Sequence, residues 1–203
     1  MQGSYGQWPV LVAAATRIST AAVELSALSE PELPSLLDFL LDGPSLPFLF
    51  VSVHAPAKAR QRPEDDLVDI LLRLRRHVDA IVMHPDVIDD PSRYRPLGST
   101  LVLENMDNRK VLGQTAAHLT PYFDELPEAG LCFDVPHAAS VDPTQVVAHE
   151  LLDVHGHRLR HVHLSSLDED SHHRSLTPAD KVRFTPLLYR CRDVPWILEA
   201  APE

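Results

Sequence analysis

The 203-residue sequence predicts an α/β fold in which a parallel sheet closes into a shortened TIM-type (β/α) barrel. Two observations lead to this prediction. Short apolar segments typical of buried strands alternate with helical patterns, and nearly every such strand ends on a histidine or an acidic residue. A chain of this length with 44% hydrophobic residues can bury one sizeable core, so a single domain over residues 1–203 is expected.

Seven strands are expected from short, β-branched apolar runs. They cover residues 21–25, 48–53, 80–83, 100–104, 130–135, 159–164 and 195–200. An eighth strand is missing, because residues 9–20 read better as a helix that leads into the first run than as a strand. The barrel is therefore expected to be trimmed or incompletely closed, with its first strand absent or atypical.

The helical patterns lie between these strands. Residues 63–78 begin with Pro63 and acidic residues and end with Arg75, Arg76 and His77, which is the charge order that a helix dipole favours. Similar segments cover residues 115–126, 142–154 and 177–190. The interval between His84 and Glu104 has room only for a turn or a short helix.

The polar residues at the strand ends favour a barrel over an open sheet. They are His54, His84, Glu104, Asp134, His163 and Glu199, at successive spacings of 30, 20, 30, 29 and 36 residues. In a barrel, the carboxyl ends of the strands meet at one mouth, whereas an open sheet spreads them along a line. No glycine-rich phosphate loop follows any strand, and the chain has only 7 glycines, so dinucleotide binding is disfavoured.

Three imidazoles and three carboxylates at one mouth predict a metal site, because without cations such a cluster is costly to bury. Nitrogen and oxygen ligands suit Zn²⁺, Mn²⁺, Fe²⁺ or Mg²⁺. Three further candidates lie on loops above the mouth: His137 follows Asp134, while Asp170 and His172 follow His163.

Composition and charge limit the binding partners and the cellular location that the sequence predicts. The formal charge is −11, with 29 acidic and 18 basic residues, which argues against strong binding to nucleic acid or anionic membranes unless bound metal contributes positive charge. Two cysteines indicate neither a disulfide framework nor a thiolate metal site. The apolar run from Val10 to Ala15 is too short for a signal core or a membrane span, so a cytoplasmic setting without membrane attachment is expected.

From residue 21 to 203, the motifs VSVHAP, VMHPD, LVLENMD, CFDVPHA, VHLSSLDEDSHHRSL and PWILEA occur in order at the strand ends. In these motifs the sequence resembles the xylose isomerase-like TIM-barrel superfamily, and within it the endonuclease IV group of apurinic/apyrimidinic endonucleases (AP endonuclease family 2). That resemblance implies up to three divalent ions, usually zinc, held by nine side chains. The matching positions are His54, His84 and Glu104 for the first ion, Asp134, His163 and Glu199 with bridging Glu104 for the second, and His137, Asp170 and His172 or His173 for the third.

The resemblance leaves two enzymatic alternatives. A hydrolase of the endonuclease IV type would act on a phosphoester, either apurinic DNA or a smaller phosphate ester, with Glu104 and Glu199 essential for catalysis. A related sugar isomerase or epimerase would use one ion, with Glu104 and Glu199 as acid and base. The loops are short, and the one basic stretch near the mouth covers residues 54–63, which weakens the case for DNA. A barrel that binds metal or a partner without turnover is the third alternative, and the unclosed sheet edge suggests a homodimer.

Residues below the mouth are expected to be structural. Cys132 reads as a small core residue, and His161 as a packed, hydrogen-bonded histidine beneath the site. Glu24, near the end of the first strand, is a candidate for the mouth lining.

Overall fold

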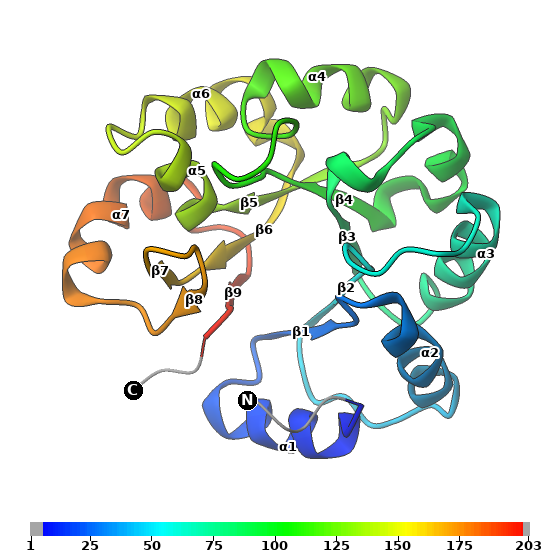
Figure 1. The fold of residues 1–203 in the computed structure, drawn as a ribbon. Helices are drawn as coiled ribbons and strands as arrows, with labels where there is room; N and C mark the ends of the chain where they lie inside the picture. Colours follow the sequence, from blue (N-terminus) through cyan, green and yellow to red (C-terminus); the bar gives the residue numbers. More distant parts are fainter. Residues whose placement is uncertain (1–5, 201–203) are drawn as a thin grey trace.

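A computed structural model describes residues 6–200 of the chain, and its centre is one parallel sheet. Its seven strands follow the order β1-β2-β3-β4-β5-β6-β9 and form a ring that Figure 1 views nearly end-on. The strands are β1 (Ala22–Ser26), β2 (Phe50–His54), β3 (Ala80–Met83), β4 (Leu101–Glu104), β5 (Gly130–Asp134), β6 (Leu159–Leu164) and β9 (Trp196–Leu198). The prediction of a TIM-type barrel with seven strands is confirmed.

Helices surround the ring (Figure 1), and the five predicted from the sequence are present within a few residues of their expected bounds. The helices are α1 (Trp8–Ile18), α2 (Leu33–Leu41), α3 (Glu64–Leu74), α4 (Ala116–Glu125), α5 (Val135–Val141), α6 (Val146–His155) and α7 (Pro178–Arg190), with short 3₁₀ segments η1 (Glu30–Glu32), η2 (Pro85–Val87), η3 (Pro91–Thr100) and η4 (Gly156–Arg158). Sequence analysis did not identify α2, and it placed α5 in a loop.

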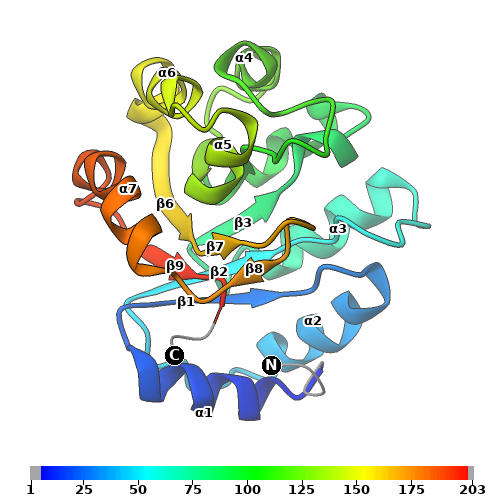
Figure 2. The same cartoon turned by 60° about the vertical axis from the view of Figure 1, so that its left-hand side comes forward.

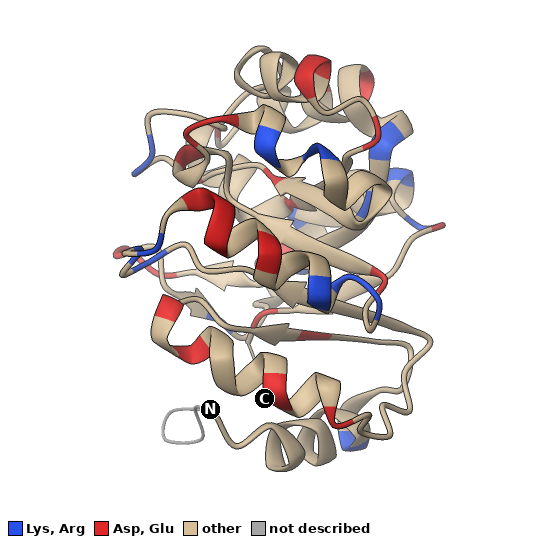
Figure 3. Cartoon of the chain, turned by 90° about the vertical axis from the view of Figure 1, so that its right-hand side faces the viewer, with Lys and Arg blue, Asp and Glu red and all other residues tan. Residues whose placement is uncertain are grey.

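Helix α3 shows how local sequence sets these elements. Its first turn carries Glu64, Asp65 and Asp66, and Arg73 lies in its last turn, so the charges oppose the helix dipole. Figure 3 shows the acidic start and the basic end of this helix on the outer face. Leu67 and Leu71, one turn apart, are fully buried against the sheet side of the core.

The core has two parts. The larger packs the helices onto the outside of the barrel and extends from Trp8 to Cys191. A smaller apolar cluster, made of Ala80, Val82, Val102 and Cys132, is separate from it. None of the helices between residues 6 and 200 combines the length and apolar composition that a membrane crossing requires.

The barrel is nearly closed, and its seam lies between β1 and β9. Each of these strands pairs with only one neighbour, β2 and β6 respectively, and within residues 6–200 no backbone hydrogen bond joins one to the other. A cavity of about 430 Å³ lies along the seam, lined by residues of both strands and of α1. The expected missing strand therefore corresponds to this position in the ring.

The segment after β6, expected as a loop, forms a small antiparallel hairpin. Strands β7 (Ser166–Leu167) and β8 (His173–Arg174) pair Leu167 with His173 and lie next to β9 in both views (Figures 1 and 2). The hairpin therefore brings the histidine-rich segment back toward the barrel mouth.

Candidate metal centre

Glu104, the last residue of β4, is the centre of the candidate site and is 1% exposed. Its Oε2 lies 3.0 Å from His54 Nε2 and 3.2 Å from His84 Nε2. Its Oε1 lies 3.3 Å from His137 Nδ1 and 3.5 Å from His163 Nδ1. One carboxylate therefore faces two pairs of imidazoles, one pair on each oxygen.

Two groups of potential ligands share Glu104. His54, His84 and Glu104 form the first group, and Glu104, Asp134, His163 and Glu199 form the second. Within the second, His163 Nδ1 lies 3.3 Å from Glu199 Oε1 and 3.9 Å from Asp134 Oδ2. The structure thus brings together the six strand-end residues, in the two sets that the resemblance implied.

Several of these atoms are buried without a hydrogen bond. Asp134 Oδ2 and His163 Nδ1 lie 3.9 Å apart, and neither has a hydrogen-bond partner among the described residues. Buried polar atoms are normally satisfied, so unsatisfied atoms that converge on one point indicate a missing cation. The donor set is made of imidazoles and carboxylates, and it fits a divalent metal.

Backbone contacts fix the orientation of two imidazoles. His54 Nδ1 donates to the carbonyl oxygen of Ala55 at 2.8 Å, which leaves Nε2 directed at Glu104. His137 Nδ1 lies 3.1 Å from the carbonyl oxygen of Asn105, and its Nε2 faces Asp107. Such contacts select the tautomer that leaves the other nitrogen free to bind metal.

Asp134 does two things at the end of β5. Its Oδ1 accepts a 2.6 Å hydrogen bond from the His137 backbone N–H and so caps helix α5, while Oδ2 is left toward the site. Pro136 near the start of α5 suits a first turn, where its missing N–H costs nothing. This capped helix, and not the loop that the sequence suggested, positions His137.

Charge pairing offsets the burial of the cluster. Burial by itself would raise the pKa of the Glu104 and Glu199 carboxyl groups, but nearby His163 holds both well below the ordinary value. Burial opposes protonation of His137, yet Asp134 and Glu104 raise the pKa of its imidazole to about 10. Burial raises the pKa of Asp134 well above its ordinary value. The metal-free cluster holds protons on these groups, and those protons would have to leave when an ion binds.

The third predicted ligand set is not assembled. Asp170 and His172 group with Asp168 on the outside of the hairpin, and His137 is not part of that group. Asp168 accepts hydrogen bonds from the backbone N–H groups of both residues, and these bonds help to lower its pKa to about 2. His172 is 65% exposed in its side chain. A third ion held by these residues stays a prediction.

His173 lies closer to the centre than His172. Its Nδ1 is 2.8 Å from Ser165 Oγ and 3.0 Å from Glu199 Oε2, and its ring centroid is 5.4 Å from that of His137. Of the two histidines that the sequence left open, the structure places His173 against the ligand group.

Sequence analysis missed two polar residues directly after Glu104. Asn105 is fully buried and bridges the ends of β4 and β5, while Asp107 is 2% exposed and lies 3.9 Å from His137 Nε2. Arg109 holds the Asp107 carboxylate with a 2.5 Å contact. Their place in the loop after a strand of the barrel is the signal that could have found them.

Glu24, predicted as a candidate for the mouth lining, lines the cavity that opens over the cluster. Its Oε2 is 3.2 Å from His163 Nε2 and accepts a 2.8 Å hydrogen bond from Ser52 Oγ. His163 therefore presents Nδ1 to the ligand group and Nε2 to Glu24.

A cavity of about 420 Å³ opens over these residues. Lys58, Arg109 and Lys110 line it together with the imidazoles and carboxylates. The cavity wall thus combines basic side chains with the potential metal ligands.

Residues 49–196, well over half of the chain, match the family model for the xylose isomerase-like TIM barrel. The chain belongs to this family. The superfamily resemblance found in the sequence is thus confirmed. Members of the xylose isomerase-like family are enzymes that typically bind divalent metals.

Solved structures agree on the fold. The chain is similar to a family 2 AP endonuclease from Brucella melitensis, with a TM-score of 0.56 and 14% identity over 93% of this chain and 84% of that one. It is similar to a 3-keto-D-glucoside 4-epimerase from E. coli, with a TM-score of 0.52 and 13% identity over 91% and 92%. It is also similar to a xylose isomerase-like TIM barrel protein from Mycobacterium smegmatis in complex with magnesium, with a TM-score of 0.56 and 13% identity over 98% and 83%. No curated protein matches the sequence significantly.

Proposed function

We propose that this protein is a divalent-metal-dependent hydrolase of phosphoesters. One observation carries the proposal: Glu104 presents Oε2 to His54 and His84, and Oε1 to His163 of the second ligand group. A carboxylate in this position can bridge two ions. A site with a single ion needs only the second group of ligands, so the His54–His84 pair favours more than one ion, with zinc as the expected metal.

Ions at this centre would clamp the phosphate, lower the pKa of an attacking water and stabilise the leaving oxygen. The chain's own residues fix that arrangement. His54 and His84 hold the first position, while Asp134, His163 and Glu199 hold the second. Lys110, paired with Asp86 at 2.6 Å, and Arg109, paired with Asp107, keep cationic groups at the cavity wall, where they orient an anionic substrate.

A small phosphate ester suits the cavity better than duplex DNA does. The cavity of about 420 Å³ is of the size that a small molecule fills. The chain carries a net charge of −11, which opposes a long polyanion outside the mouth. The substrate class that we propose is therefore a phosphomonoester or a small phosphodiester, with apurinic DNA as a weaker alternative.

A sugar isomerase or epimerase is the second candidate. Glu104 and Glu199 both contact His163 Nδ1, at 3.5 and 3.3 Å, so the two carboxylates flank one ligand position, as an acid and a base would. One structural neighbour is named as an epimerase. In this mechanism the His54–His84 pair has no role as a metal ligand.

Metal counting on His84→Gln separates the two candidates. For a hydrolase, we expect this variant to bind one zinc ion fewer than the wild type and to lose phosphoesterase activity by more than about 100-fold, beyond the 10–100-fold typical of groups that only support a ligand. His77→Gln, which changes an exposed imidazole outside the cavity and the potential ligand groups, is the matched control and should keep both the zinc count and the activity.

Glu104→Gln should abolish turnover while the far-ultraviolet circular dichroism stays that of the wild type. Retention of the full zinc count by His84→Gln, with activity on ketoses or aldoses and none on phosphoesters, would establish the isomerase instead. Full metal loading with no activity on phosphoesters or on sugars would favour a binding protein without turnover.

A cytoplasmic location is proposed from the two free thiols alone.

A further inference from the structure

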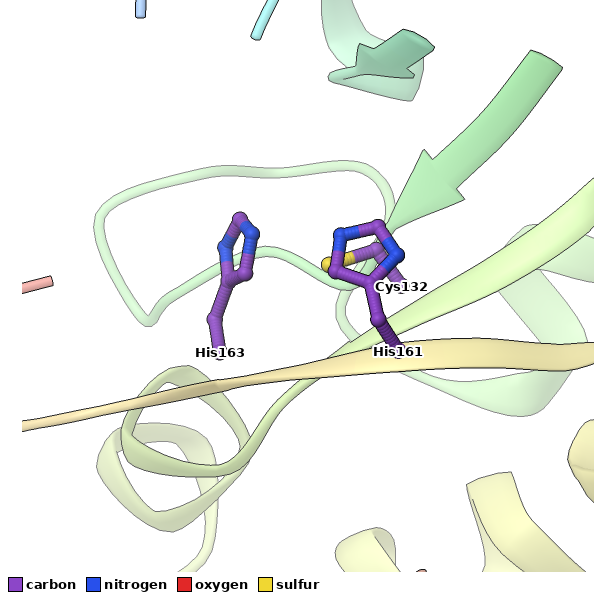
Figure 4. Close-up of side chains that lie close together, drawn as sticks. All are labelled: Cys132, His161 and His163. Carbon is purple, nitrogen blue, oxygen red and sulfur yellow. The ribbon is translucent and has the colours of Figure 1, made fainter. Parts of the chain in front are cut away.

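A further group of potential ligands lies within the barrel beside the proposed metal centre. Cys132 of β5 pairs in register with His161 of β6, and His163 follows on the same face of β6. All three side chains are fully buried. Figure 4 shows the two imidazole rings on one side of β6 with the thiol of Cys132 beside them.

The ligand atoms of these residues converge. The Cys132 sulfur and one nitrogen from each imidazole all lie within 4.8 Å of one another. Ligands around a tetrahedral zinc ion stand roughly 3.5 Å apart, given bond lengths of about 2.0–2.3 Å. Closing the group around an ion therefore requires side-chain movements of about 1 Å.

His161 is the residue that the fold leaves unexplained. The sequence predicted a packed, hydrogen-bonded histidine. The packing is confirmed, since His161 is fully buried, but neither Nδ1 nor Nε2 has a hydrogen-bond partner within residues 6–200, so the hydrogen-bonded part of the prediction is wrong. The nearest carboxylate oxygen, Glu24 Oε2, is 3.6 Å from Nε2. Buried imidazole nitrogens are normally satisfied, and a bound metal ion would satisfy one nitrogen of His161.

Glu24 supplies negative charge and a route of entry. Its carboxylate lies within 3.6 Å of both imidazoles and is 5% exposed. Glu24 lines the cavity at the mouth and also the cavity along the β1–β9 seam. A cation that reaches this carboxylate from either side is next to the buried group.

We propose that Cys132, His161 and His163 bind a zinc ion inside the barrel, at a position beside the Glu104 centre that shares His163 with it. Soft thiolate with imidazole selects zinc over magnesium or manganese. His163 faces both positions, with Nδ1 toward Glu199 and Nε2 toward Glu24, so with both ions bound it would bridge them as an imidazolate that has released its ring proton. The site is buried and stabilises the barrel, whereas the Glu104 centre is open to its cavity.

Cobalt is the probe that distinguishes this site, because only a thiolate ligand gives a thiolate-to-cobalt charge-transfer band in the near ultraviolet. The metal-free full-length protein is titrated with Co²⁺ and the bound ions are counted. We expect the band in the wild type. Cys132→Ser should lose it together with one ion per chain. Cys191→Ser, which changes the other buried cysteine and one that belongs to no potential ligand group within residues 6–200, is the matched control and should keep both.

His84→Gln separates this proposal from the proposed function, since it should lose one ion yet keep the band. His161→Gln retains the thiol and should raise the cobalt concentration at half-maximal band intensity by at least about tenfold; this variant decides the matter if Cys132→Ser does not fold. Absence of the band in the wild type, its persistence in Cys132→Ser, or an unchanged titration of His161→Gln would overturn the proposal.

Discussion

Glu104 shows at the scale of one residue why the cluster is tolerated in a barrel interior. Its carboxylate is almost fully buried, and an isolated buried charge is very costly. Four imidazole nitrogens at 3.0–3.5 Å offset that cost. Removing one member leaves the others unpaired, so substitutions here act on both metal binding and folding.

His155 lies away from the site, and its titration gives the stability of the fold a pH dependence that metal binding does not affect. It ends α6, is 4% exposed, and donates from Nε2 to the carbonyl oxygen of Ala116 at 3.1 Å. Burial lowers the pKa of its imidazole below the ordinary 6.5. The unfolded chain then takes up the proton first, so stability from neutral His155 is present above about pH 6.5 and is lost as the pH falls below it.

We therefore expect His155→Gln to lose less stability than the wild type between about pH 7 and pH 5. Urea unfolding of the metal-free protein at both pH values measures this. His157→Gln, an exposed neighbour, serves as the control and should behave like the wild type. Identical pH slopes for His155→Gln and the wild type would contradict the assignment.

At the scale of elements, Asn105 joins two strand ends. Its Nδ2 donates to the carbonyl oxygen of Asp134 and its Oδ1 accepts from the Asp134 N–H, both at 2.8 Å. The carboxylate of the same Asp134 caps α5 and contributes to the ligand group. This pair of hydrogen bonds therefore fixes β5, α5 and the site against β4.

Asn105→Ala should destabilise the fold by about 2–4 kcal/mol, because two hydrogen bonds are lost and buried backbone groups stay unsatisfied. Chemical denaturation of the metal-free protein tests this. Asn108→Ala, three residues on and exposed, should change stability by no more than about 0.5 kcal/mol. Equal effects of the two substitutions would show that the bridge between the strand ends does not stabilise the fold.

At the scale of the whole molecule, the unclosed seam sets the pattern of local stability. β4 and β5 each have a partner on both sides, while β1 and β9 each have one. Backbone amides of edge strands open more easily than those of central strands. Hydrogen exchange followed by mass spectrometry should show slow exchange in β4 and β5 and faster exchange in β1 and β9. Equal protection in all four strands would contradict an open seam.

The same measurement tests the homodimer expected from the sequence. If a second copy pairs with the seam edge, protection of β1 and β9 should rise with protein concentration. Exposed apolar side chains at this edge, Trp196 and Leu198, would then become buried.

The strands and the grouping of the six strand-end polar residues could be predicted because their rules are local. Apolar runs bounded by turn residues define buried strands, and the carboxyl ends of parallel strands lie at one edge. We can therefore predict that strand-end residues 20–36 positions apart in sequence lie together, without knowing any contact in advance. Residues on the loops follow no such rule. Asp170 and His172 turned away on the hairpin, while His173 and Asp107 turned toward the centre.

The sequence by itself determined the barrel, the metal-competent mouth and the family. Only the tertiary structure decided which atoms converge. The register between β5 and β6 places Cys132 against His161, the capped α5 turns His137 toward Glu104, and the seam falls between β1 and β9. Composition and spacing encode which residues share a strand face, but a contact between strands depends on barrel register and side-chain rotamers, which the whole packed core sets together.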